Sequence, residues 1–220
     1  MTINTSPHTA NNPHAQQPVR QLGTPLQAAK RAVILLHGRG ANAADILGLS
    51  EYLEVEDTCF IAPEAYGRQW YPQRFTVPTT QNEPFLTSAL TLVDNLVKHV
   101  LAAGIPAEKL VLGGFSQGAC LALEYAARNP RPYGAVVALS GGLIGETLDT
   151  NRYGQDMAGM TVFLGCSDVD PHIPLTRVQE STALFKQAGA TVTERIYPGM
   201  PHTINEDELN WVRERLADIS

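Results

Sequence analysis

The pentapeptide Gly-Phe-Ser-Gln-Gly at residues 114–118 constrains the fold more than any other feature of the chain. The apolar run at residues 109–112 before it predicts a buried strand, and residues 119–128 after it predict a helix. A serine on such a tight turn needs small neighbours two residues away on each side, because larger side chains would collide there. The turn also lifts the hydroxyl clear of the sheet and directs the first helical amides at any developing negative charge. Ser116 is therefore a candidate nucleophile.

Strand and helix patterns alternate from residue 31 onward, which favours an α/β fold. Strands that are apolar along their whole length are typical of a mostly parallel sheet with helices on both faces. Ligands bind beyond the carboxyl ends of such strands, so we expect the site there. The predicted strands are residues 32–36, 58–62, 109–112, 134–139, 161–164 and 192–197, and the predicted helices lie near residues 43–52, 84–103, 119–128, 175–187 and 206–218.

The N-terminal segment differs in composition from the rest of the chain. Residues 1–25 are rich in Asn, Gln, Pro, Thr and His and offer little to bury, which predicts a disordered tail that includes His8 and His14. Residues 26–220 then form a single α/β domain. A chain of 220 residues leaves no room for a large cap domain over the site.

The acidic balance of the chain excludes some classes of partner. The formal net charge is −6 and no basic cluster occurs, which argues against binding to nucleic acid or to an anionic membrane. No run approaches the roughly 18 apolar residues of a membrane span, and the N-terminus lacks the pattern of a secretion signal. Cys59, Cys120 and Cys166 lack the spacing of metal ligands or of a redox pair, and Cys120 and Cys166 lie in apolar runs, so we predict buried free thiols in a cytoplasmic protein.

A serine nucleophile needs a histidine base and an acid that orients it. His99 lies within a predicted helix, and His37 ends the first predicted strand, where we expect it to shape the loop. His172 and His202 remain as candidates. His202 follows the strand at residues 192–197 through a Pro-Gly turn, which is where the base belongs if the chain order is Ser, Asp, His.

Two aspartates compete for the role of the acid. Asp168 and Asp170 both lie between the strand at residues 161–164 and the helix at residues 175–187. Counting from the strand-ending Gly165 favours Asp168, whereas counting back from the start of the helix favours Asp170. Either carboxylate can instead cap the helix. The count from the strand gives Asp168 a slight preference.

An oxyanion hole needs two backbone donors about 3 Å from the reacting oxygen. The amide of Gln117, which follows the nucleophile, is one candidate, and the amide of Arg39 in the glycine loop at residues 37–40 is the other. A phosphate-binding loop is the alternative for this glycine loop, but the Gly-Lys-Ser/Thr sequence and the three-glycine dinucleotide spacing are missing. We therefore expect neither a metal nor an organic cofactor.

Four segments of the chain resemble the phospholipase/carboxylesterase family of α/β-hydrolases, which includes acyl-protein thioesterases and small bacterial carboxylesterases. The segments are Leu-His-Gly-Arg-Gly at residues 36–40, Gly-Phe-Ser-Gln-Gly-Ala at 114–119, Leu-Ser-Gly-Gly at 139–142 and Tyr-Pro-Gly-Met-Pro-His at 197–202. They follow the family's order, and the resemblance runs from about residue 31 to the C-terminus. It implies an α/β-hydrolase fold, with Ser116 as nucleophile, His202 as base, and the amides of Arg39 and Gln117 as the oxyanion hole.

The chain departs from the family pattern at two places. In the family a glycine is followed by two residues, the aspartate and then a Val/Ile-Pro helix start. This chain has two extra residues between the glycine and the helix, so both Asp168 and Asp170 stay open. Pro201 stands where the family usually has glycine before the histidine, and proline removes a backbone donor. Trp70 and Tyr71 resemble the aromatic pair that lines the acyl-binding side in relatives.

These features predict a serine carboxylesterase that hydrolyses short- to medium-chain esters or thioesters through an acyl-enzyme. Trp70, Tyr71 and Phe75 are expected to wall the acyl or alcohol pocket, and packing within their loop is the alternative role. A lysophospholipase or an acyl-protein thioesterase is the alternative function. A non-catalytic binding module is a third, although such a protein would be expected to have lost a member of the triad. Since members of this family often dimerise, a homodimer is a further expectation.

Overall fold

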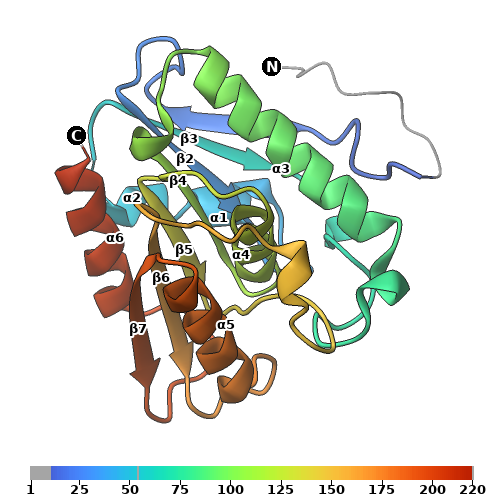
Figure 1. The fold of residues 1–220 in the computed structure, drawn as a ribbon. Helices are drawn as coiled ribbons and strands as arrows, with labels where there is room; N and C mark the ends of the chain where they lie inside the picture. The colour runs from blue at the N-terminus through green and yellow to red at the C-terminus, as the bar shows by residue number, and fades with distance from the viewer. Residues whose placement is uncertain (1–10, 54, 220) are drawn as a thin grey trace.

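Seven strands form a single sheet in the computed structural model, which describes residues 11–53 and 55–219 (Figure 1). The order across the sheet is β1-β3-β2-β4-β5-β6-β7. Strand β1 runs antiparallel to β3, and all other neighbouring strands are parallel, which confirms the predicted mostly parallel sheet. The strands are β1 Val19–Gly23, β2 Arg31–Leu36, β3 Thr58–Pro63, β4 Leu110–Phe115, β5 Ala135–Leu139, β6 Thr161–Ser167 and β7 Thr191–Tyr197.

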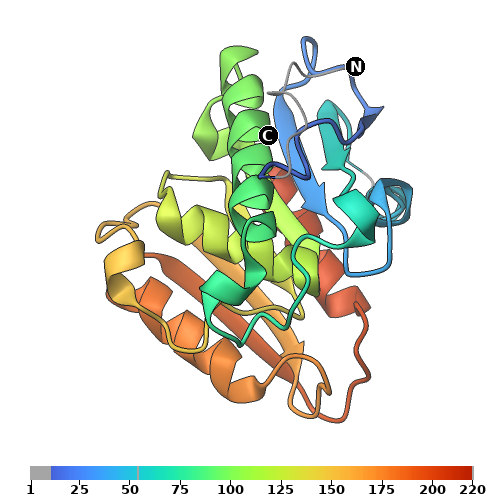
Figure 2. The same ribbon diagram turned by 90° about the vertical axis from the view of Figure 1, so that its right-hand side faces the viewer.

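Helices cover both faces of this sheet, as predicted (Figures 1 and 2). The larger apolar core lies between the sheet and α3, α4 and α5, and the smaller core lies between the other face and α1, α2 and α6. Strands β2, β3 and β5 are buried at every position because both faces are covered, which explains their uninterrupted apolar sequences. The helices are α1 Ala43–Leu47, α2 Ser50–Leu53, α3 Phe85–Ala102, α4 Gln117–Arg128, α5 Leu175–Gln187 and α6 Glu206–Asp218.

The helix predicted near residues 43–52 is two short helices. Gly48 ends α1, and its amide donates to the carbonyl oxygens of Ala44 and Asp45. At the other end Asn42 caps α1, and its side-chain oxygen accepts a hydrogen bond from the backbone amide of Asp45. A glycine within a helical pattern marks such an end more often than a helix interior.

The N-terminal segment is more ordered than its composition predicts. Val19–Gly23 pairs with β3 as strand β1, and His14 is fully buried. The His14 backbone amide donates to Ser88 Oγ in α3, and the Ser88 hydroxyl donates to Asn12 Oδ1. The prediction of a disordered tail is therefore wrong for residues 11–25, because hydrogen bonds to β3 and α3 replace the apolar burial that the segment lacks. Residues 1–10, including His8, lie outside the described residues.

Two long connections leave the carboxyl ends of strands. Residues 64–84 follow β3 and residues 140–160 follow β5, and both contain only short 3₁₀ turns, at Tyr66–Arg68, Thr79–Asn82 and Thr150–Arg152. Neither connection builds a cap domain.

Helix α3 and the cysteines are both part of the buried interior. Within the described residues, α3 is the one helix with the length and composition of a membrane span, and its apolar side packs into the larger core. Cys59, Cys120 and Cys166 are buried free thiols, as predicted.

Candidate active site

Ser116 occupies the sharp turn between β4 and α4. Its backbone has φ +55° and ψ −117°, a conformation that a residue with a side chain adopts only when the surroundings enforce it. Gly114 and Gly118 leave no room for side chains: a Cβ on Gly118 would lie 2.0 Å from the carbonyl oxygen of Leu36, and a Cβ on Gly114 would lie 2.6 Å from the same oxygen. Both glycines of the pentapeptide are thus required by the contact between the elbow and β2.

His202 connects Ser116 to a carboxylate. It lies in the loop between β7 and α6, with Nε2 2.9 Å from Ser116 Oγ and Nδ1 2.6 Å from Asp170 Oδ2. A carboxylate only accepts hydrogen bonds, so Nδ1 carries the proton and Nε2 is free to accept the proton of the serine. The ring also packs against the ring of Phe115, with centroids 4.8 Å apart. The three groups are arranged as a Ser-His-Asp triad is.

Asp170, and not Asp168, contacts His202. The slight preference for Asp168 rested on a strand that ends at Gly165, but β6 continues to Ser167, which pairs with Tyr197 of β7. Because the strand is two residues longer, the aspartate that reaches His202 is the one two positions further along the chain. The carboxylate of Asp168 instead accepts a hydrogen bond from the Gly199 amide at 2.8 Å.

The environment of Asp170 favours its charged form. Its side chain is fully buried, and burial alone would raise the pKa. The hydrogen bond from His202 and those from the amides of His172 and Ile173 outweigh this effect and lower the pKa of Asp170. Oδ1 takes both amides and Oδ2 takes His202, so each oxygen of the carboxylate has a fixed partner.

Two residues that line the cavity beside Ser116 have backbone amides without an acceptor among the described residues. Gln117 is the first residue of α4, so its amide has no partner in the helical ladder. In the loop after β2, the amides of Gly40 and Ala41 donate to Arg68 and Gly38, whereas the Arg39 amide has no acceptor among the described residues. Arg39 and Gln117 both line the same cavity as Ser116.

The side chains of Arg39 and Gln117 hold the loop that follows β3. The Arg39 guanidinium donates to the carbonyl oxygens of Tyr71, Pro72 and Gln73 and to Gln69 Oε1, at 2.8–3.0 Å. Gln117 accepts from the Trp70 amide at 2.9 Å and donates to the Tyr71 carbonyl at 2.8 Å. These contacts fix residues 69–73 over the elbow.

Trp70 and Tyr71 have different positions. Tyr71 lines the cavity, but Trp70 does not: it is fully buried, and its indole Nε1 donates to the His37 carbonyl at 2.8 Å. The expectation that Trp70 lines the pocket is therefore wrong, because the buried indole packs against the rings of His14 and His37. Phe75, by contrast, lines the cavity.

His37 shapes the loop, as expected from its position at the end of β2. Its Nδ1 donates to the Gly38 carbonyl at 2.8 Å, and its Nε2 accepts from the Ala65 amide at 3.1 Å. Burial lowers the pKa of His37, although the Gly38 hydrogen bond acts in the opposite direction. A neutral imidazole thus joins the glycine loop to the chain after β3.

A cavity of about 500 Å³ opens beside the Ser116 hydroxyl. Its volume is within the range of small-molecule sites. Its walls are Gly38, Arg39, Ala41, Tyr71, Pro72, Gln73, Arg74, Phe75, Phe115, Ser116, Gln117, Cys120, His172, Ile173 and His202. Sequence reasoning did not identify Arg74, Phe115 or Cys120 as part of the site, and it considered His172 only as a base. The distance of Arg74 from the elbow along the chain left no local signal for it.

The chain is similar in sequence to known carboxylesterases and thioesterases. The model of the family described as Phospholipase/Carboxylesterase matches residues 20–220. The acyl-protein thioesterase 1 of Saccharomyces cerevisiae is 28% identical over 207 residues, which cover 84% of this chain and 90% of that protein. A probable carboxylesterase SOBER1-like of Arabidopsis thaliana is 27% identical, covering 87% of this chain and 81% of that protein.

Solved structures agree with the fold. The crystal structure of a phospholipase/carboxylesterase from Dyadobacter fermentans has a TM-score of 0.89 and 44% identity, and the match covers 92% of this chain and 97% of that one. The crystal structure of esterase PE8 has a TM-score of 0.76 and 27% identity, with coverage of 93% and 98%.

Proposed function

The chain belongs to the phospholipase/carboxylesterase family of α/β-hydrolases and is a hydrolase of carboxylic esters or thioesters, and from this premise we propose that Ser116, His202 and Asp170 form its catalytic triad. The observation that carries the proposal is the pair of hydrogen bonds on His202, 2.9 Å to Ser116 Oγ and 2.6 Å to Asp170 Oδ2. A nucleophile within reach of a base, and a base oriented by an acid, is the arrangement that acyl transfer needs.

The first half of the reaction forms an acyl-enzyme. His202 Nε2 takes the proton of Ser116 as its oxygen attacks the substrate carbonyl, and the amides of Arg39 and Gln117 stabilise the oxyanion that develops. Asp170 stabilises the imidazolium that results, and its own low pKa keeps it charged. His202 then gives the proton to the leaving alcohol or thiol as the tetrahedral intermediate collapses.

The second half releases the acid. A water molecule loses a proton to His202 Nε2 and attacks the acyl carbonyl, and the same two amides stabilise the second oxyanion. The proton returns to Ser116 Oγ as the acyl bond breaks. No step requires a metal ion or an organic cofactor.

The shape of the site favours short to medium acyl chains. The described residues form no cap domain over the cavity, and Phe75 and Tyr71 give it an apolar wall. The names of the curated relatives support a second candidate, an acyl-protein thioesterase, for which the acyl group would arrive on a protein thiol. The rates of hydrolysis of an acylated peptide thioester and of small esters distinguish these two candidates. Faster hydrolysis of the peptide thioester would favour the thioesterase.

The decisive experiment measures hydrolysis of p-nitrophenyl esters of increasing acyl length by the wild-type protein and by Ser116→Ala. We expect activity that disappears in the variant while its circular dichroism and melting temperature stay unchanged. Undiminished activity of Ser116→Ala would refute the proposed triad. A folded wild-type protein that turns over neither esters nor thioesters would favour the non-catalytic binding module.

A further inference from the structure

The charged groups around the cavity are all of one sign. Apart from His202, the ionisable side chains of basic type in its walls are Arg39, Arg74 and His172, and no aspartate or glutamate lines it. The chain as a whole has a net charge of −6, so the basic lining of the cavity differs in sign from the net charge of the protein. A cleft lined by one sign of charge concentrates ligands of the opposite sign.

Arg39 contributes a charge that no carboxylate neutralises. Its two terminal guanidinium nitrogens donate to four oxygen atoms, all of them carbonyl or amide oxygens of residues 69–73. These neutral acceptors fix the position of the guanidinium but leave its positive charge in place. The loop that forms one wall of the cavity is therefore built around a permanent cation.

Arg74 extends the same wall and is free to bind. Its side chain is exposed and makes no ion pair within the described part of the chain. Its backbone is fixed, because buried Asn82 donates to the Arg74 carbonyl at 3.1 Å and accepts from the Gln73 amide at 2.8 Å. The structure thus presents an unpaired guanidinium on an anchored segment at the cavity.

His172 adds a third basic group from a different loop. It lies between β6 and α5, is exposed, and meets the ring of His202 edge to face with centroids 4.8 Å apart. Asp170, two residues before it in the chain, does not line the cavity, and both of its carboxylate oxygens are occupied by His202 and by the amides of His172 and Ile173. Asp170 therefore offers little compensation for the basic groups at the cavity.

We propose that the substrate of this site is an anionic ester, one that carries a carboxylate or a similar oxyacid group beside the scissile bond, and that Arg74 binds that group. The proposal rests on the esterase function proposed above and specifies its substrate class. A planar guanidinium donates two parallel hydrogen bonds to a carboxylate, and such charge-assisted bonds are among the strongest that a side chain makes.

The test compares matched esters that differ only in charge. On the acyl side the pair is monophenyl glutarate and phenyl methyl glutarate, and on the alcohol side it is 4-acetoxybenzoate and its methyl ester. We expect kcat/KM of the wild-type protein to favour the anionic member of at least one pair by about tenfold, with the preference falling as ionic strength rises. The pair that shows the preference identifies the side on which the anion binds.

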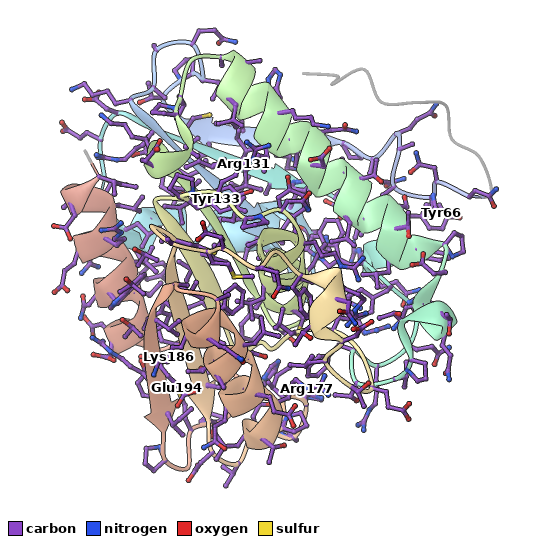
Figure 3. All side chains as sticks on the ribbon, viewed as in Figure 1. Tyr66, Arg131, Tyr133, Arg177, Lys186 and Glu194 are labelled. Atoms are coloured by element: carbon purple, nitrogen blue, oxygen red, sulfur yellow. The ribbon has the colours of Figure 1, made fainter. Side chains whose placement is uncertain are left out.

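Variants of Arg74 separate its charge from its bulk. Arg74→Gln is expected to remove most of the preference through a higher KM for the anionic ester, and Arg74→Lys is expected to retain part of it. Arg131→Gln makes the same change of charge in the exposed loop between α4 and β5, at the end of the sheet away from the carboxyl ends of the strands (Figure 3). This control is expected to leave the ratio of the two kcat/KM values unchanged.

The outcomes distinguish this inference from the proposed function. Equal kcat/KM for anionic and neutral esters, or the same preference in Arg74→Gln as in the wild-type protein, overturns the inference and leaves the esterase function standing. Absence of turnover with all four esters contradicts the proposed function, and the inference with it.

Discussion

The carboxylate of Asp168 accepts a 2.8 Å hydrogen bond from the backbone amide of Gly199, and this contact joins the end of β6 to the turn that carries His202. Gly199 has φ +67°, so the turn depends on a left-handed conformation that the Asp168 contact helps to hold. Asp168 thus contacts the turn that leads to His202, whereas Asp170 contacts the His202 ring itself. The two aspartates, two residues apart, act on His202 at different points.

We predict that substitutions of these aspartates differ strongly in their effect. Asp170→Asn is expected to lower kcat by about 10³–10⁴-fold, because an amide in place of the carboxylate no longer enforces the tautomer of His202. Asp168→Ala is expected to lower kcat by only about tenfold, since it loosens the turn but leaves the triad contacts available. Steady-state kinetics on one ester checks both, and equal mild losses would mean that the acid of the triad lies elsewhere.

The glycines of the elbow provide a prediction about folding. Gly118→Ala would place a methyl group 2.0 Å from the Leu36 carbonyl oxygen, so either β2 or α4 must shift. We expect loss of soluble, folded protein or a melting temperature too low to measure a native transition. Gly104→Ala is the matched control, because Gly104 has φ +96° but an added Cβ would meet no atom within 4 Å. That variant is expected to lose only about 1–3 kcal/mol of stability in urea unfolding, and similar behaviour of the two variants would contradict the steric argument.

A feature could be predicted from the sequence where the residues that determine it lie close together along the chain, and not where they lie far apart. The elbow could be predicted because Gly114, Ser116 and Gly118 fall within one short pentapeptide, although the atoms that exclude side chains at the two glycines include the carbonyl oxygen of Leu36 in β2. The choice between the aspartates could not, because it depends on how far β6 pairs with β7, which only the register of the two strands determines.

The predictions for residues 11–25 and for Trp70 were wrong for the same reason. His14 is held by contacts with Tyr66 and Trp70, 52 and 56 positions away along the chain, and no local pattern reports such contacts. Trp70 was assigned to the pocket from its aromatic type, but its burial is decided by the rings of His14 and His37. The four longer helices, α3 to α6, whose patterns are local, match their predicted bounds within two residues.

His14 is expected to make stability depend on pH on the acid side. Its Nδ1 accepts from the Tyr66 amide and its Nε2 donates to the Trp70 carbonyl, so the folded protein needs the neutral ring. Burial lowers the pKa of His14 from 6.5 to about 4. The unfolded chain therefore binds more protons between these two values, and stability is lost as the pH falls from about 6.5 toward 4, by up to about 3 kcal/mol.

Comparison with His14→Asn isolates this contribution. The Asn side chain can still accept from the Tyr66 amide but does not titrate, so the free energy of unfolding should fall less steeply between pH 6.5 and pH 4.5 than in the wild-type protein. Urea unfolding at half-unit steps of pH measures the two slopes. Parallel curves for the two proteins would show that His14 does not carry the effect.

Glu208 is expected to act with the opposite sign over much of the same pH range. Its fully buried carboxyl accepts from the Asn205 amide at 2.9 Å in the capping box of α6, while Oε1 has no partner among the described groups. Burial raises the pKa of Glu208 from 4.5 to about 7. The folded protein therefore binds more protons than the unfolded chain between these values, and stability falls as the pH rises from about 4.5 through 7, by up to about 3 kcal/mol.

Glu208→Gln keeps an acceptor for Asn205 but stays neutral, so its free energy of unfolding should lose this negative slope between pH 5 and pH 8. A slope equal to that of the wild-type protein would mean that Glu208 is charged in the folded state throughout this range.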